Sequence, residues 1–113
     1  MGYVEKMFEN LKTAVVACDV DFKVTYANEK CKQMFKASMD VESFVGKHMG
    51  DFHTPGTMAK LENLFADYKE KKKNMDYYTL DTPGGKLTIV NTPFYEGDAF
   101  AGVVEFLFEG SLA

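Results

Sequence analysis

Three short β-rich segments close this chain, and they constrain its fold more than any other part of the sequence. They span residues 75–80, 86–94 and 100–108, and aromatic and β-branched residues dominate them. Pro83-Gly84-Gly85 separates the first two segments, and Tyr95-Glu96-Gly97-Asp98 separates the last two. Both are turn sequences. Because connections this short join antiparallel neighbours, the segments predict a three-stranded meander.

The first half of the chain adds two strands and several helices. Residues 13–19 and 23–27, joined by a turn at Asp19-Val20-Asp21, predict a hairpin. Residues 29–36 and 57–73 carry apolar residues at helical spacing, and either Thr54 with Pro55 or Thr57 starts the second of these helices. One further turn is expected near residues 40–44. The predicted fold is α+β, a five-stranded antiparallel sheet with helices packed on one face.

The chain has 113 residues, which favours one domain. We expect that domain at residues 13–110, preceded by a short helix at residues 1–12 that acts as an N-terminal cap. Tyr3 and Leu11 fall on one apolar stripe of this helix. It is too short to be stable alone, so it must dock on this domain, dock on a second copy, or continue into an upstream segment.

Composition excludes several classes of protein. The net charge is −4 and the sequence has no arginine, so nucleic-acid binding is not expected. No apolar run approaches the roughly 20 residues that span a membrane, and the first residues show no signal-peptide pattern, which indicates a cytoplasmic domain. Cys18 and Cys31 are expected to be buried free thiols. No nucleophile–base or metal-protease motif occurs, so we do not expect an enzyme.

Segments at both ends of the chain resemble a PAS domain. Ala14 to Asp19 followed by Val24 to Asn28 resembles the family's first hairpin and helix start, and Pro93-Phe94 followed by Gly102 to Glu105 resembles its last two strands. The resemblance implies strand order 2-1-5-4-3 and a pocket between the sheet and the helices. It also implies a sensor that signals to an output domain, with a homodimer expected through the N-terminal helix.

The middle of the chain is similar to a narrower group. Gly46 to Pro55, ahead of a leucine-rich helix, resembles the haem-binding PAS domains of chemotaxis transducers and related bacterial sensors. That resemblance implies haem b, with His53 as the proximal ligand to iron. Two departures stand out: Pro55 follows the histidine by two residues rather than three, and Phe106 replaces a tryptophan whose indole N–H can donate to bound oxygen.

A neutral imidazole is a suitable axial ligand for haem iron, and a single one leaves a site open for a diatomic gas. A porphyrin also needs a pocket of several hundred Å3. From the helical side, that pocket is expected to be lined by Phe52, Met58, Leu61, Leu64 and Phe65. From the sheet, it is expected to be lined by Leu87, Ile89, Asn91, Val104 and Phe106.

Other interpretations of these residues stay open. His53 could simply order its loop, and His48 could be a second axial ligand, a pH-sensitive residue or a solvated side chain. Asn91 could contact a ligand or bond a neighbouring strand, and Tyr77 or Tyr78 could replace the missing indole donor. The first function predicted is therefore a haem sensor of gas or redox state. The alternative is a protein-interaction or dimerisation module, with no cofactor or with a small apolar organic ligand.

Overall fold

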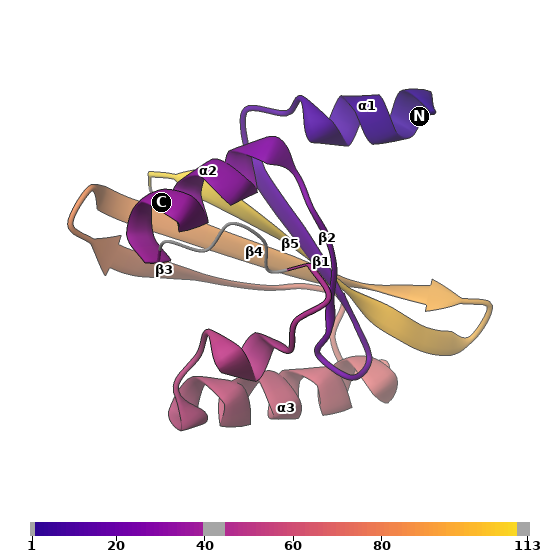
Figure 1. The fold of residues 1–113 in the computed structure, drawn as a ribbon. Coiled ribbons are helices and arrows are strands. Elements are labelled where there is room, and N and C mark those ends of the chain that lie inside the picture. The colour runs from indigo at the N-terminus through magenta and orange to yellow at the C-terminus, as the bar shows by residue number, and fades with distance from the viewer. Residues whose placement is uncertain (1, 40–44, 111–113) are drawn as a thin grey trace.

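A computed structural model of the chain describes residues 2–39 and 45–110 (Figure 1). The turn expected near residues 40–44 lies outside the described residues. The elements in chain order are α1 (Tyr3–Glu9), β1 (Ala14–Asp19), β2 (Val24–Ala27), α2 (Glu29–Met39), the 3-10 turn η1 (Met49–Asp51), α3 (Pro55–Lys69), β3 (Asp76–Thr82), β4 (Gly85–Glu96) and β5 (Ala99–Glu109).

The five strands form one antiparallel sheet in the order β2-β1-β5-β4-β3. The predicted architecture and strand order are therefore confirmed. The last strand lies in the centre, between β1 from the start of the chain and β4 from its end (Figure 1). A buried residue on β5 consequently has neighbours from both halves of the sequence.

The long helix α3 begins where its sequence provides a cap. The Oγ1 atom of Thr54 accepts a hydrogen bond of 3.2 Å from the backbone N–H of Thr57, and Pro55 occupies the first helical position. Of the two predicted starts, the earlier one is therefore the actual one. The helix then buries Leu61, Leu64 and Phe65 against the sheet, in the apolar spacing that the sequence shows.

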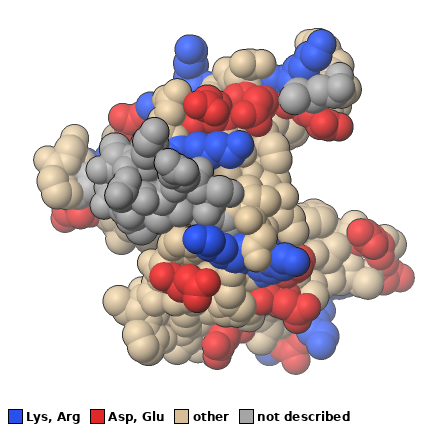
Figure 2. Space-filling view, in the orientation of Figure 1, with Lys and Arg blue, Asp and Glu red and all other residues tan. Residues whose placement is uncertain are grey.

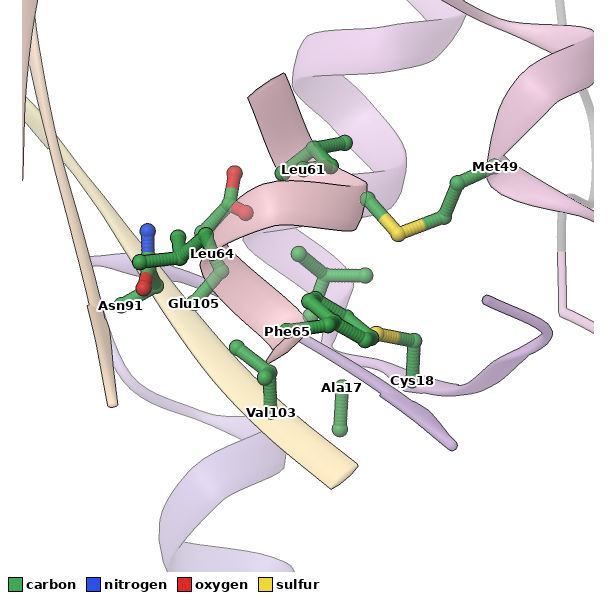
Figure 3. Close-up of a pocket in the computed structure, with 10 residues that line it drawn as sticks. Ala17, Cys18, Met49, Leu61, Leu64, Phe65, Asn91, Val103 and Glu105 are labelled. Carbon is green, nitrogen blue, oxygen red and sulfur yellow. The ribbon is translucent and has the colours of Figure 1, made fainter. Parts of the chain in front are cut away.

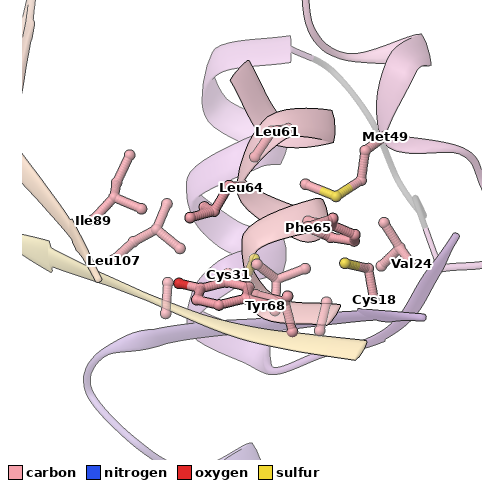
Figure 4. Packing of buried hydrophobic residues seen from close by; sticks show 14 residues of the cluster. Cys18, Val24, Cys31, Met49, Leu61, Leu64, Phe65, Tyr68, Ile89 and Leu107 are labelled. Carbon is pink, nitrogen blue, oxygen red and sulfur yellow. The ribbon is translucent and has the colours of Figure 1, made fainter. Parts of the chain in front are cut away.

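One apolar cluster fills the space between the sheet and the helices α2 and α3 (Figure 4). Phe65 lies near its middle, stacked on Phe22 at a centroid distance of 4.3 Å and edge-on to Phe100 at 5.6 Å. The helix α1 stays outside this cluster, at the far side of α2 from α3, and has no buried residue (Figure 1).

A β-bulge in β5 decides which side chains reach the cluster. Tyr95 pairs with Phe100 and Phe94 pairs with Gly102, so Ala101 is an extra residue in β5. Phe100 packs on the cluster before the bulge, whereas Val103 and Leu107 are the buried residues after it. In a strand without a bulge, every second side chain stays on the same face of the sheet, so Phe100 and Val103 could not both point inward. The expectation that Val104 and Phe106 face the pocket is therefore wrong.

Acidic and basic side chains are interspersed over the visible surface (Figure 2). Several of them form exposed ion pairs, such as Lys86 with Asp81 at 2.8 Å. Among the described helices, none combines the length and the apolar character needed to cross a membrane.

Candidate functional site

A small cavity lies between the inner face of the sheet and α3, where a PAS-like pocket is expected (Figure 3). Its volume is about 10 Å3, near the minimum that can hold one water molecule. Most of its wall is apolar. The lining residues are Val16, Ala17, Cys18, Met49, Leu61, Leu64, Phe65, Asn91, Val103 and Glu105.

Two polar side chains interrupt the apolar wall of the cavity. Asn91 on β4 and Glu105 on β5 are direct partners across the two strands, and both reach the cavity (Figure 3). Removal from water raises the pKa of the Glu105 carboxyl from 4.5 to about 7. The carboxyl therefore changes charge near neutral pH, which an exposed glutamate does not do.

Asn91 links the sheet to the long helix. It is only 1% exposed, and its Oδ1 accepts a hydrogen bond from the phenolic hydroxyl of Tyr68 on α3. The same hydroxyl lies 3.3 Å from the backbone oxygen of Asn91. Tyr95 donates in turn to the backbone oxygen of Tyr68 at 2.6 Å. The buried asparagine therefore bonds a neighbouring element, as one interpretation of the sequence expects. Its Nδ2 has no hydrogen-bond partner among the described residues.

The two cysteines are free and buried, as predicted. Burial is the main cause that raises the pKa of Cys18 and of Cys31 to about 12. Both are therefore neutral thiols near pH 7, and they contribute to the cluster as small apolar side chains.

His53 lies just before α3 and is half-buried, but it does not line the cavity. Burial lowers the pKa of its imidazole, which favours the neutral form. His48 is exposed, and its Nδ1 accepts a hydrogen bond of 2.8 Å from the backbone N–H of Gly50. This bond caps the N-terminus of η1, so His48 orders its own loop.

The residues predicted for the haem pocket divide into three groups. Leu61, Leu64, Phe65 and Asn91 line the cavity. Ile89 belongs to the buried cluster, and three partly buried side chains pack against that cluster without reaching the cavity, namely Phe52, Met58 and Leu87. Val104 and Phe106 lie on the opposite face of the sheet, where Phe106 stacks on Phe108 at a centroid distance of 6.4 Å.

The cavity does not fit a haem in this arrangement. A tetrapyrrole needs several hundred Å3, and the cavity offers about 10 Å3. A larger hollow of about 610 Å3 lies between the turns at Asp21 and Asp98, along α3. It includes Phe65 but not His53, and it opens to solvent. Haem binding thus stays a prediction that the packing of the described residues does not support.

Several residues that shape the site were not predicted from the sequence. Tyr68 and Met49 lie within a predicted helix and a predicted loop, and Glu105 lies within a predicted strand, but none of the three was expected at the pocket. The sequence does carry a signal for Glu105, because it is the single carboxylate of the predicted segment 100–108, which is otherwise apolar. A charged residue in such a strand indicates either a solvated face or a buried functional group.

Comparisons with known proteins agree with this architecture. The C-terminal domain of a Streptococcus mutans protein superimposes with a TM-score of 0.74 at 15% identity, over 94% of this chain and 81% of that one. The PAS domain of Bordetella pertussis BvgS gives 0.70 at 10% identity, over 96% and 85%. A sensory box sensor histidine kinase from Vibrio cholerae gives 0.62 at 12% identity, over 97% and 90%.

No curated protein matches the chain at a significant level. The model of a family described as "PAS domain", in contrast, matches residues 4–109. That span includes every strand of the sheet, both polar residues of the cavity and His53. This chain therefore belongs to the PAS domain family.

Proposed function

We propose that this PAS domain is a sensory module that works through its packed interior, without haem, and relays a change there to an output domain. The observation that carries the proposal is the filling of the cavity by the chain's own side chains, chiefly Leu61, Leu64 and Phe65. The solved PAS domains of sensor histidine kinases share the fold, which supports a signalling role. Any catalytic step belongs to the output domain.

The sheet offers a short path from the cavity to a partner. Glu105 lines the cavity, and its neighbour Phe106 lies on the opposite face, because successive side chains of a strand point to opposite sides. Phe106 and Phe108 are only partly buried there. A shift of β5 inside the domain therefore changes an apolar outer surface that an output domain can contact.

The absence of a haem role is tested by absorption spectroscopy. The purified chain is mixed with hemin, and the Soret band is compared between wild type, His53→Ala and the control His48→Ala. The expected result is the same spectrum for all three, because His53 lines neither the small cavity nor the larger hollow beside α3. A shifted Soret band in wild type and His48→Ala that disappears in His53→Ala would establish haem binding instead.

The N-terminal helix supports a second proposal, a homodimer. Tyr3, Val4 and Met7 of α1 are 82%, 60% and 46% exposed, so its apolar side chains have little cover within the chain. A second copy that packs against them would bury this surface.

Light scattering after size-exclusion chromatography tests the homodimer. We expect a dimer for the wild type and a monomer for the double variant Val4→Lys, Met7→Lys. This variant keeps the hydrogen bond of 2.9 Å from Asn28 Nδ2 to the backbone oxygen of Phe8, which holds α1 to the domain. A monomeric wild-type chain would disprove the dimer and leave the sensory proposal intact.

A further inference from the structure

Glu105 lies on β5, the central strand of the sheet, which pairs with β1 from the first half of the chain and with β4 from the second half. Across the sheet, Val16 on β1 and Asn91 on β4 are its direct partners. Its carboxylate side chain lines the cavity beneath α3 (Figure 3). The residue remains partly exposed, so protons can exchange with solvent, while most of the cavity lining is apolar.

Burial alone accounts for the raised pKa of this carboxyl. Among the described residues, the side chains whose own pKa the charge of Glu105 raises come from four elements and include no lysine. They are Cys18 on β1, Cys31 on α2, Tyr68 on α3 and Tyr78 on β3. Burial raises the pKa of all four, to about 12 for both thiols and for Tyr78, so they are neutral near pH 7. Asp76, which pairs with Asn91 from β3, adds a half-buried carboxylate on the same side.

The amide of Asn91 is the nearest partner that could respond to the charge. Its Oδ1 already accepts from the hydroxyl of Tyr68, while its Nδ2 is buried and finds no acceptor in the described part of the chain. A buried amide hydrogen without an acceptor is costly, and a carboxylate is the strongest acceptor that a protein offers. An ionised Glu105 therefore attracts Asn91 Nδ2, the one buried side-chain nitrogen of the described residues that lacks a hydrogen-bond partner.

We propose that Glu105 is a proton-binding sensor site whose ionisation repositions the Asn91 amide and, through Tyr68, shifts α3 on the sheet. When the carboxyl releases its proton to solvent, the carboxylate accepts a hydrogen bond from Asn91 Nδ2. To make this bond, the Asn91 amide must turn away from its present position. This turn also moves its Oδ1, which accepts the hydrogen bond from Tyr68. When the proton returns, the carboxyl is neutral and the packing seen here is restored.

The proton is then the signal for the proposed sensory function, and the proposal rests on that function only for the steps beyond α3. The coupling itself is measurable in the isolated chain. A failed coupling would leave a haem-free sensory module with another signal. If the chain does bind haem, the coupling between Glu105 and α3 is still tested independently by the pH titration.

The test is an NMR titration of the whole chain between pH 5 and pH 9. The side-chain 13Cδ of Glu105 and the backbone amides of Leu61 to Tyr68 are followed together. Both histidines are replaced by asparagine in a parallel sample, because imidazoles titrate in the same range. We expect Glu105 and the α3 amides to share one midpoint near 7 in both samples.

Three variants separate coupling from simple titration. Glu105→Gln should abolish the response of α3, whereas Glu109→Gln, an exposed carboxylate on the same strand, should leave it unchanged. Tyr68→Phe should leave Glu105 titrating while α3 no longer responds. A Glu105 midpoint near 4.5, α3 amides that ignore Glu105, or an α3 response that survives Tyr68→Phe would each overturn the proposal. The wild-type titration decides even if one variant fails to fold.

Discussion

Asn28 and Val15 hold each other by two hydrogen bonds of 3.0 Å. The backbone N–H of Asn28 donates to the backbone oxygen of Val15, and the backbone N–H of Val15 donates to Oδ1 of Asn28. The same Oδ1 accepts from Cys31 N at the start of α2, and Nδ2 donates to the backbone oxygens of Phe8 and Thr13. One buried amide thus ties α1, β1 and α2 together.

Replacing this amide should cost more stability than any surface change. Asn28→Leu leaves four backbone groups without their partners, and each buried one costs about 1–3 kcal/mol. We expect the free energy of unfolding, measured with urea, to fall by about 4 kcal/mol or more. The control is Asn10→Ala, which removes one exposed bond to Lys6 and should change stability by less than about 0.5 kcal/mol. Equal losses in the two variants would contradict the role of Asn28.

Glu105 should make the protein less stable as pH rises. The folded chain keeps a proton on Glu105 up to about pH 7, whereas the unfolded chain releases it near 4.5. Folding therefore takes up a proton between these values, and the free energy of unfolding falls across this window by up to about 3 kcal/mol. Glu105→Gln lacks the titration and should exceed the wild type in stability above pH 7. Urea unfolding at pH 5 and pH 8 checks this, and parallel pH profiles of the two proteins would refute it.

His53 should act in the opposite direction. Burial lowers the pKa of its imidazole in the folded state, so the unfolded chain binds the proton more readily. Its contribution to stability is complete above about pH 6.5 and is lost as pH falls through the lower, folded value. We expect His53→Gln to remove this contribution, so the variant should gain stability relative to the wild type as pH falls from 7 to 5. An NMR midpoint for His53 at or above 6.5 would show that burial does not act as described.

Gly102 should not accept a side chain, because β1 passes too close to it. A Cβ atom there would lie 2.2 Å from the backbone oxygen of Cys18 and 2.8 Å from the ring of Phe94. The phenylalanine ring can turn away, but the backbone of a central strand cannot. We expect Gly102→Ala to lower the free energy of unfolding by about 3 kcal/mol or more.

Gly56 provides the matched control for Gly102. It lies in the first turn of α3, and the nearest atom to an added Cβ is Thr54 Oγ1 at 4.0 Å. Alanine favours a helix over glycine by up to about 1 kcal/mol, so Gly56→Ala should leave stability unchanged or raise it. Thermal unfolding of both variants gives the comparison, and a Gly102→Ala protein as stable as the wild type would disprove the close approach.

Local sequence was enough for the elements and for the fold class. Turn residues mark both hairpins of the meander, and Thr54 with Pro55 marks the start of α3, because caps and turns depend on a few adjacent residues. The ordered set of segments then matched one family, and that family carries one strand order. Simple alternation along β4 also predicted correctly that Ile89 and Asn91 point to the buried face.

The inner face of β5 was decided by the tertiary structure alone. The residues on both faces of β5 are largely apolar. Hydrophobicity alone therefore favoured the face with Phe106 and Phe108 as the inner one. The bulge at Ala101, whose position depends on pairing with Phe94 and Tyr95 of β4, changes the faces and turns Glu105 inward. Neither the bulge nor the bond from Tyr68 to Asn91 is local, since Tyr68 and Asn91 lie 23 residues apart in the sequence. The sequence by itself therefore determined the PAS fold, and the long-range register of the sheet decided which residues meet in its cavity.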